Sequence, residues 1–186
     1  EEVTLSVPLD RKRMIKLNPR KNAEFPPRSK SVDRLDRPCY PVRIVSEKKP
    51  ITQHLVEGRN RPAKWIAVRF KRHKQWLDLS WEDYYRSCEA CGLGLSALGL
   101  LAGDRVAVVS NTRWEWGALD FGILGLGAVT IPVYQSNRAE EIEFILQNSE
   151  PRVLVLEDQS QFRKWETIAK RCKSVEHVIV INAFND

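Results

Sequence analysis

Three groups of residues in this sequence have types and spacings that could support chemistry. Cys88 and Cys91 stand three positions apart, which is the spacing of a thiol–disulfide redox pair. The run from Gly92 to Ala97 has the glycine pattern of a loop that binds a dinucleotide pyrophosphate. Trp114 and Tyr134 are aromatic residues that follow two predicted strands, where a substrate or an interface could meet them.

The cysteine pair and the glycine run both lie in one predicted helix, which starts at a Ser80–Asp83 capping box. A redox pair needs a thiol of lowered pKa at a helix N-terminus, whereas Cys88 and Cys91 lie two turns inside on the apolar stripe. A pyrophosphate loop must follow a strand and open a helix, but the glycine run comes at the far end of this one. We therefore predict core packing for both cysteines and no nucleotide site here.

Trp114 and Trp116 flank Glu115 just beyond a predicted strand, at the carboxyl edge where open α/β sheets bind ligands. A ligand contact and a structural lid over the sheet edge both fit this position. Trp114 and Tyr134 are the candidates for a substrate-side or interface role. The sequence assigns no catalytic, cofactor-binding or metal-binding residue, and His73 in its basic turn is predicted to be solvated.

Short runs of valine, isoleucine and leucine must position these side chains. They recur about two dozen residues apart with a helical pattern in each gap, as parallel βαβ units require. Because the runs are apolar throughout, helices should cover both faces of the sheet. The predicted fold class is α/β, a mostly parallel, doubly wound sheet with flanking helices. The runs are Val106–Val109, Val129–Ile131, Val153–Leu156 and Val178–Ile181.

The stretch from Phe121 to Tyr134 is predicted to pass from a helix end through a glycine turn into a buried strand that Pro132 closes. Gly127 is placed at the tight turn, where positive φ favours glycine. A β-branched residue there should cost more than the roughly 1 kcal/mol of an ordinary glycine replacement.

The segment before the sheet is predicted to form a short helix over residues 51–62, ended by Gly58, and then a β-hairpin. The hairpin strands are residues 65–70 and 75–79, and Lys71–Lys74 form its turn. Three later helix starts are predicted at Thr112–Glu115, at Asn137–Glu140, and at Asp158 with Gln161.

Charge divides the chain into two parts. Residues 1–50 carry 13 Lys or Arg against 7 Asp or Glu, whereas residues 51–186 carry 17 of each. Prolines interrupt the first part and no period is sustained there, so we predict an irregular, basic, proline-rich N-terminal extension. An anionic membrane surface is a candidate partner of this arm. Nucleic acid is not expected, because the neutral globular part offers no positive stripe.

Apolar runs and cysteines bear on the compartment. No stretch reaches the roughly 18–20 apolar residues of a membrane span, and four cysteines are too few for a disulfide scaffold at this length. We predict a cytoplasmic protein, at most peripheral to a membrane. Because the predicted sheet ends on a strand with no closing helix, it is expected to be an incomplete piece of a larger domain.

The order of motifs resembles the start of the adenylate-forming enzymes, the AMP-dependent synthetase and ligase superfamily. The resemblance rests on Ser80–Tyr84, on the turn Leu-Gly-x-x-x-Gly-Asp-Arg-Val-Ala over Leu98–Ala107, and on Gly-Ala-Val-x-x-Pro-x-Tyr over Gly127–Tyr134. Within the superfamily the chain is most similar to the N-terminal part of a long-chain acyl-CoA synthetase, over residues 51–181. Trp114 stands where relatives commonly have proline, and both residues suit the first turn of a helix.

This resemblance implies a full-length enzyme that activates a long-chain carboxylate with ATP through an acyl-adenylate and then transfers the acyl group to coenzyme A. It implies ATP, Mg²⁺ and coenzyme A for that enzyme. None is expected to bind this segment alone, because the 186 residues contain neither a Ser/Thr/Gly-rich phosphate loop ending in lysine nor the family's adenylation lysine. Residues 51–186 are then a truncated N-terminal α/β subdomain, a scaffold that is inactive alone.

The implied partners are the remainder of the same polypeptide, namely a nucleotide-binding subdomain and a C-terminal domain, and the fatty acid; a homodimer is a further candidate. The alternative is a free-standing, non-enzymatic α/β module that binds a partner through its basic arm. The reading frame after Asp186 distinguishes the two, because a phosphate loop there indicates the enzyme and a stop codon the module.

Overall fold

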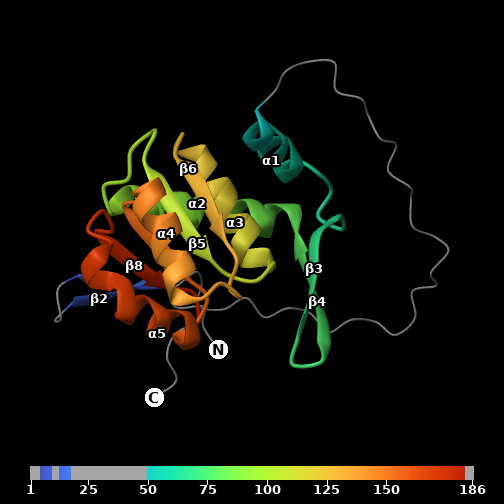
Figure 1. Ribbon diagram of the computed structural model, residues 1–186. Helices are drawn as coiled ribbons and strands as arrows, with labels where there is room; N and C mark the ends of the chain where they lie inside the picture. Colours follow the sequence, from blue (N-terminus) through green and yellow to red (C-terminus); the bar gives the residue numbers. More distant parts are fainter. Residues whose placement is uncertain (1–4, 10–12, 18–49, 183–186) are drawn as a thin grey trace.

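The computed structural model describes residues 5–9, 13–17 and 50–182. Its eight strands are β1 (Leu5–Leu9), β2 (Arg13–Leu17), β3 (Ile66–Arg72), β4 (Gln75–Ser80), β5 (Arg105–Val109), β6 (Val129–Val133), β7 (Val153–Leu156) and β8 (His177–Val180). Six of them form one sheet in the order β2-β1-β8-β7-β5-β6, and β3 with β4 forms a separate hairpin (Figure 1). Neighbouring strands from β8 to β6 are parallel, as predicted.

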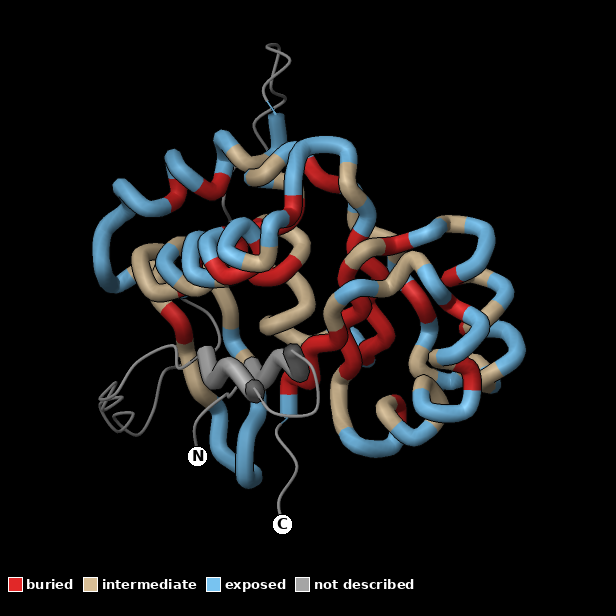
Figure 2. Tube along the Cα trace, turned by 90° about the vertical axis from the view of Figure 1, so that its left-hand side faces the viewer, coloured by how far each residue is buried: buried red, intermediate tan, exposed pale blue. Residues whose placement is uncertain are grey.

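Helices cover both faces of the parallel strands, which confirms the doubly wound prediction. On β5, Val106 and Val108 pack with α2 and α3, whereas Ala107 and Val109 pack with α4 and α5. Strands β5, β7 and β8 are therefore buried on both faces. Figure 2 shows the buried residues gathered in the interior of the molecule. The helices are α1 (Ile51–Arg59), α2 (Trp81–Ala97), α3 (Trp114–Gly125), α4 (Ala139–Ser149) and α5 (Gln159–Ile168), which continues into the 3-10 turn η2 (Ala169–Arg171).

Side-chain caps start two of the helices where the sequence predicts them. The Ser80 hydroxyl accepts a hydrogen bond from the Asp83 N–H at 3.1 Å, and the Asp158 carboxylate accepts one from the Ser160 N–H at 2.9 Å. Helix α4 begins one residue later than the predicted box. There the Arg138 N–H donates to the Glu141 carboxylate at 2.8 Å.

Two glycines allow α2 and α3 to pack backbone against backbone. A Cβ added at Gly122 would lie 2.8 Å from the Gly92 nitrogen and 2.9 Å from the Cys88 carbonyl oxygen. The rejected pyrophosphate pattern therefore has a packing role at Gly92. Gly58 also differs from its prediction, because it lies inside α1 rather than ending it. Glycine is needed there because a side chain would collide with the Trp81 ring.

Gly127 sits at the predicted turn between α3 and β6 with φ of 72°, and an added Cβ would lie 3.2 Å from Ala102 Cβ. The strand that follows is not the buried strand that was predicted. Among the described residues β6 is an edge strand, with Val129 45% exposed. The Val129 N–H donates to the Asp104 carbonyl at 2.8 Å, so by alternation the nitrogen of Pro132 points away from β5. Pro132 thus lies within β6 rather than closing it.

The predicted hairpin is present with a tighter turn. The strands run to Arg72 and from Gln75, which leaves His73 and Lys74 as the turn, with φ of 47° and 65°. The prediction of an irregular N-terminal extension is wrong for β1 and β2. Their backbones form an antiparallel pair, and Ser6 of β1 pairs with Val180 of β8. The other residues of the predicted arm, up to residue 49, lie outside the described part.

Candidate functional site

The carboxyl ends of β5, β7 and β8 meet at one edge of the sheet. The chain leaves β5 through α3 to reach β6 on one side, and it leaves β7 through α5 to reach β8 on the other. Neighbouring strands β5 and β7 therefore form a topological switch point, where open α/β sheets bind ligands. Ser110 and Asn111 follow β5 here, Glu157 follows β7, and Asn182 lies just beyond β8.

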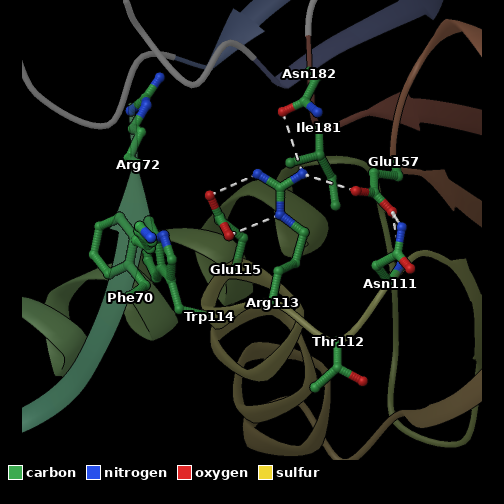
Figure 3. A pocket seen from close by; sticks show the side chains of 11 residues that line it. Phe70, Arg72, Asn111, Thr112, Arg113, Trp114, Glu115, Glu157, Ile181 and Asn182 are labelled. Atoms are coloured by element: carbon green, nitrogen blue, oxygen red, sulfur yellow. Dashed lines mark hydrogen bonds and ion pairs between the residues drawn. The ribbon is translucent and has the colours of Figure 1, made fainter. Parts of the chain in front are cut away.

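A cleft of about 450 Å³ lies beside this edge (Figure 3). The rings of Phe70 from the hairpin and Trp114 from α3 pack 5.6 Å apart on one side, and polar side chains from the strand ends line the other. The cleft therefore joins the hairpin to the switch point. Its lining residues are Phe70, Lys71, Arg72, Asn111, Thr112, Arg113, Trp114, Glu115, Glu157, Ile181 and Asn182.

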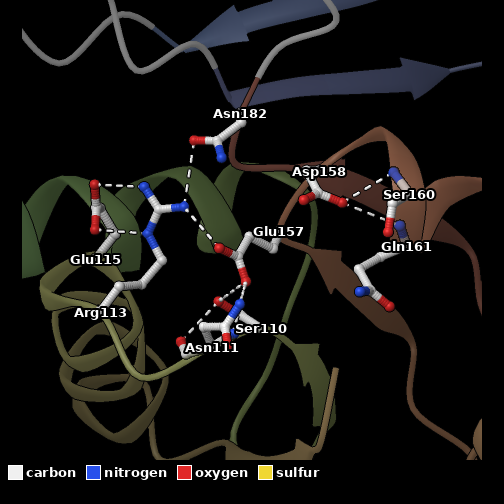
Figure 4. A network of polar contacts seen from close by, with 9 residues as sticks. All are labelled: Ser110, Asn111, Arg113, Glu115, Glu157, Asp158, Ser160, Gln161 and Asn182. Carbon is white, nitrogen blue, oxygen red and sulfur yellow. Dashed lines mark hydrogen bonds and ion pairs between the residues drawn. The ribbon is translucent and has the colours of Figure 1, made fainter. Parts of the chain in front are cut away.

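Glu157 bridges the chain segments that follow β5 and β7 (Figure 4). One carboxylate oxygen accepts hydrogen bonds from the Asn111 N–H at 2.6 Å, from the Asn111 side-chain amide at 2.9 Å, and from the buried Ser110 hydroxyl at 3.3 Å. The other oxygen accepts from Arg113 Nη1 at 3.4 Å. The Glu157 side chain is only 14% exposed, so it holds the two loops together from within the protein.

Arg113 is the central cation of the network. It donates to both carboxylate oxygens of Glu115 at 2.8 Å and to the Asn182 side-chain oxygen at 3.3 Å. These partners raise the pKa of the guanidinium above its ordinary value, with the hydrogen bond to Glu115 as the largest cause. The predicted Thr112–Glu115 capping box is wrong. Arg113 is the residue before α3 and makes no side-chain cap, while Glu115 binds Arg113 instead.

The charges at the carboxyl ends of the strands pair with one another, and Lys71 and Arg72 of the hairpin also line the cleft. A cation paired with two carboxylates is not available to neutralise a phosphate, and each carboxylate already accepts hydrogen bonds. No group of three His, Cys, Asp or Glu suited to a metal ion occurs among the described residues. The arrangement can hold loops and shape a cleft, and within the described part it does not form a phosphate cradle.

The structure separates the two aromatic candidates. Trp114 lines the cleft, whereas Tyr134 is 78% exposed and is not among the lining residues. The loop after Tyr134 is fixed to α5, because Lys164 Nζ donates to the carbonyls of Gln135 at 2.6 Å and Asn137 at 2.9 Å. Both roles remain predictions.

The cysteine pair lies in the core, as predicted. Cys88 belongs to the cluster with Leu55 and Tyr84, and Cys91 packs against it. Burial raises the pKa of both thiols to about 12, so neither provides a thiolate for redox chemistry at neutral pH. His73 lies exposed in the hairpin turn, as predicted.

Sequence reasoning missed Arg113 and Glu157, the two residues that organise the site. Glu157 directly follows the apolar run of β7, and Ser110 stands at the equivalent place after β5. The shared position at the carboxyl ends of adjacent parallel strands is the signal that could have paired them. The contact of Arg113 with Glu157 had no comparable signal, because the two residues are 44 positions apart.

Comparison with known proteins identifies the family of this chain. A family model described as "AMP-binding enzyme" matches residues 56–186. The chain belongs to this family. As a member of the AMP-binding enzyme family the chain belongs to the adenylate-forming superfamily, which confirms the resemblance seen in the sequence, including the likeness to the N-terminal part of acyl-CoA synthetases.

Curated relatives of this chain include long-chain-fatty-acid–CoA ligases. FadD15 of Mycobacterium bovis is 46% identical over 85 residues, which cover 46% of this chain and 14% of that protein. ACSBG2 of Xenopus laevis is 30% identical over 122 residues, which cover 64% of this chain and 16% of that protein. The chain thus spans only about a sixth of the length of the relatives it matches.

Solved structures share the fold of this segment. An anthranilate CoA ligase, AuaEII, in complex with anthranoyl-AMP superposes with a TM-score of 0.62 at 24% identity, over 70% of this chain and 24% of that one. A fatty acyl CoA synthetase of Mycobacterium tuberculosis gives 0.53 at 26% identity, over 56% and 21%. None of the described helices is long and apolar enough to span a bilayer.

Proposed function

We propose that this chain is the N-terminal segment of a long-chain fatty-acid–CoA ligase. The whole enzyme would activate a long-chain carboxylate with ATP through an acyl-adenylate and transfer the acyl group to coenzyme A, in the cytoplasm. The proposal is supported by the match of residues 56–186 to AMP-binding enzymes and by the 46% identity to a long-chain-fatty-acid–CoA ligase over 85 residues.

Residues 51–186 serve as the scaffold subdomain in this proposal, and residues 1–50 as a separate basic extension. The observation that carries the scaffold role is the closed network at the switch point, where Arg113 is held by Glu115 and Glu157. These residues do not fit the phosphates of ATP or its Mg²⁺, and we assign the adenylation chemistry to the remainder of the polypeptide. The remainder of the polypeptide, with its nucleotide-binding subdomain and C-terminal domain, and the fatty acid are the partners that the scaffold needs.

An ATP–pyrophosphate exchange assay with a long-chain fatty acid tests the proposal. The purified 186-residue chain should show no acid-dependent exchange above a mock purification, because its sequence contains no Ser/Thr/Gly-rich phosphate loop ending in lysine. Fusing the chain to the rest of the polypeptide that its gene encodes should restore exchange and acyl-CoA formation. Exchange that co-elutes with the 186-residue chain itself would refute the scaffold role.

The same experiment separates this proposal from the free-standing module. A gene whose reading frame stops after Asp186 offers no remainder to fuse, and the enzyme proposal would then be wrong. A fused polypeptide that forms acyl-adenylate only from short or aromatic acids would retain the family and refute the long-chain substrate.

A further inference from the structure

The tip of the β3–β4 hairpin, residues 71–76, gathers positive charge and one large aromatic ring at an exposed end of the molecule. Lys71, Arg72, His73 and Lys74 follow one another, Trp76 comes two positions later, and all five are exposed. In Figure 1 the turn of the hairpin extends beyond the sheet and its helices, while Lys71 and Arg72 also line the edge of the cleft. Figure 2 shows the same loop as an exposed projection.

The two faces of the hairpin have different surroundings. Val68, Phe70 and Leu79 face the domain, where they join the cluster around Leu55 and Tyr84. The other face points to solvent and carries two cross-strand pairs. In one the Arg69 guanidinium binds the Asp78 carboxylate at 2.8 Å, and in the other Lys71 Nζ lies 6.0 Å from the centre of the Trp76 ring.

Trp76 therefore does not contribute its ring to the core. Its exposure of 54% is high for a tryptophan, whose amphipathic ring prefers an apolar or interfacial environment. An exposed indole beside an ammonium group is the combination that suits the boundary between lipid headgroups and acyl chains.

The charge of the hairpin is one-sided. Residues 66–80 contain four Lys or Arg and one acid, Asp78, which Arg69 already binds. Lys74 makes no ion pair within the described part of the chain. Residues 51–186 as a whole are neutral, so the hairpin tip is a local positive site on a balanced domain.

The turn retains this charge at a conformational cost. Two-residue turns with positive φ at both positions favour Asn-Gly, because a side chain is strained in that region. Here the positions hold His73 and Lys74, with φ of 47° and 65°. Strain of this kind is concentrated at functional sites, which indicates that the side chains matter more than the ease of the turn.

We propose that the hairpin tip docks on an anionic lipid bilayer. The ammonium groups of Lys71 and Lys74 contact headgroup phosphates, and the Trp76 ring enters the interface beside them. A nucleic acid is a poorer partner, because strand binding needs a positive groove that follows the phosphates and this charge is confined to one projecting turn. The proposal stands on the hairpin and does not depend on the proposed enzyme activity.

Co-sedimentation of the 186-residue chain with vesicles tests this docking. The chain should bind vesicles of phosphatidylcholine mixed with phosphatidylglycerol, bind phosphatidylcholine alone far more weakly, and dissociate as salt increases. The double variant Lys71→Gln/Lys74→Gln should bind about 25-fold more weakly, at about fivefold per lysine. The matched control is Lys170→Gln/Lys173→Gln, which removes the same charge from two exposed lysines near η2 and should change binding less than twofold.

The basic N-terminal segment is present in every variant, so the difference between the two double variants reports the hairpin alone. Equal losses in both would show that net charge binds the membrane, and no loss in the first would show that other residues do; either result overturns the proposal. Failure of the wild-type chain to bind anionic vesicles would overturn it too. So would tighter binding to single-stranded RNA than to vesicles at the same salt, lost in Lys71→Gln/Lys74→Gln.

Lys74→Gly separates charge from folding, because its two effects have opposite signs. Glycine relieves the turn at φ of 65°, so the denaturation midpoint should rise, while vesicle binding should fall about fivefold. Trp76→Ser should also weaken binding several-fold with little loss of stability, since the ring lies outside the core. Unchanged binding by Lys74→Gly would assign the turn a purely structural role and refute the docking.

Discussion

The two ends of strand β7 each carry one charged residue that ties the strand to its neighbours, and the two residues have opposite signs. At the amino edge, Arg152 Nη1 binds the Asp104 carboxylate at 2.6 Å and Nη2 binds the Glu176 carboxylate at 2.7 Å. At the carboxyl edge, Glu157 binds Asn111 and Arg113. Four apolar residues separate these two bridges, which we call the Arg152 bridge and the Glu157 bridge.

The signs follow from the direction of the helices. Helices α2 and α4 end at the amino edge, where Arg152 also donates to the Gly99 carbonyl at 3.0 Å, and α3 and α5 begin at the carboxyl edge. A cation at helix C-termini and a carboxylate at helix N-termini are both favourable. Charge at a sheet end is therefore no mark of a ligand site by itself. What distinguishes Glu157 is its burial, 14% exposed against 31% for Arg152, and the cleft beside it.

The largest effect is expected for Glu157→Ala. The variant leaves the Asn111 N–H and one side of Arg113 without their acceptor in a half-buried place, which should cost about 2–4 kcal/mol. Urea denaturation measures the loss, and Glu157→Gln, which keeps one acceptor oxygen, should lose less. If Glu157→Ala proved milder than Arg152→Ala, the ranking of the two bridges by burial would be wrong.

Gly127→Val tests whether backbone conformation, in addition to charge, stabilises the amino edge of the sheet. With φ of 72° and Ala102 Cβ 3.2 Å away, valine should cost about 2 kcal/mol, more than an ordinary glycine replacement. Gly125→Ala is the matched control, because an added Cβ there meets nothing within 4 Å. It should be neutral or slightly stabilising. Thermal melting of both variants compares them, and equal losses would contradict the placement of the turn.

Arg152→Ala should destabilise less than either of these, and its effect should depend on salt. The bridge is partly exposed to solvent, so added salt screens it in the wild type and should narrow the difference between the two proteins. The Glu157 bridge is more buried and should respond less. Denaturation midpoints at low and high salt provide the comparison, and a gap that does not change with salt would argue against exposed ion pairing.

The smallest effect is expected in acid. The Leu101 N–H and Arg152 lower the pKa of Asp104 below its ordinary 3.8, and Arg152 lowers that of Glu176 below 4.5. Because the pKa values in the folded state are lowered, these carboxylates contribute stability that is fully present above pH 4.5. It is lost as the pH falls through the folded-state pKa values. Arg152→Ala should lose less stability than the wild type between neutral pH and pH below 3.8. Acid titrations of both proteins by circular dichroism measure this difference. A larger loss in Arg152→Ala than in the wild type would contradict the prediction.

Local signals in the sequence sufficed for much of the fold. Ser80 and Asp158 cap α2 and α5 because their side chains bind amides two or three residues away. The turn at Gly127 follows from backbone freedom at a single residue. The parallel strands follow from runs that are apolar on both faces, a property that each run carries alone.

The misses depend on residues far apart in the sequence. The sequence predicts that Gly58 ends a helix, whereas its role is to leave room for the Trp81 ring. The sequence predicts Thr112 as a cap, but Arg113 precedes α3 and binds Glu115 and, across 44 residues, Glu157. An apolar run such as β6 cannot reveal whether it lies at the centre or the edge of a sheet, because neighbours decide that.

The outward nitrogen of Pro132 limits how β6 can recruit another chain. A segment approaching this edge would find the N–H of Thr130 but no second donor at Pro132, so a continuous ladder could not extend along the strand. Exposed edges with every donor intact are the usual templates for fibril growth. Among the described residues β6 is the open side of the parallel strands, and Pro132 makes that side a poor template for a strand of another copy.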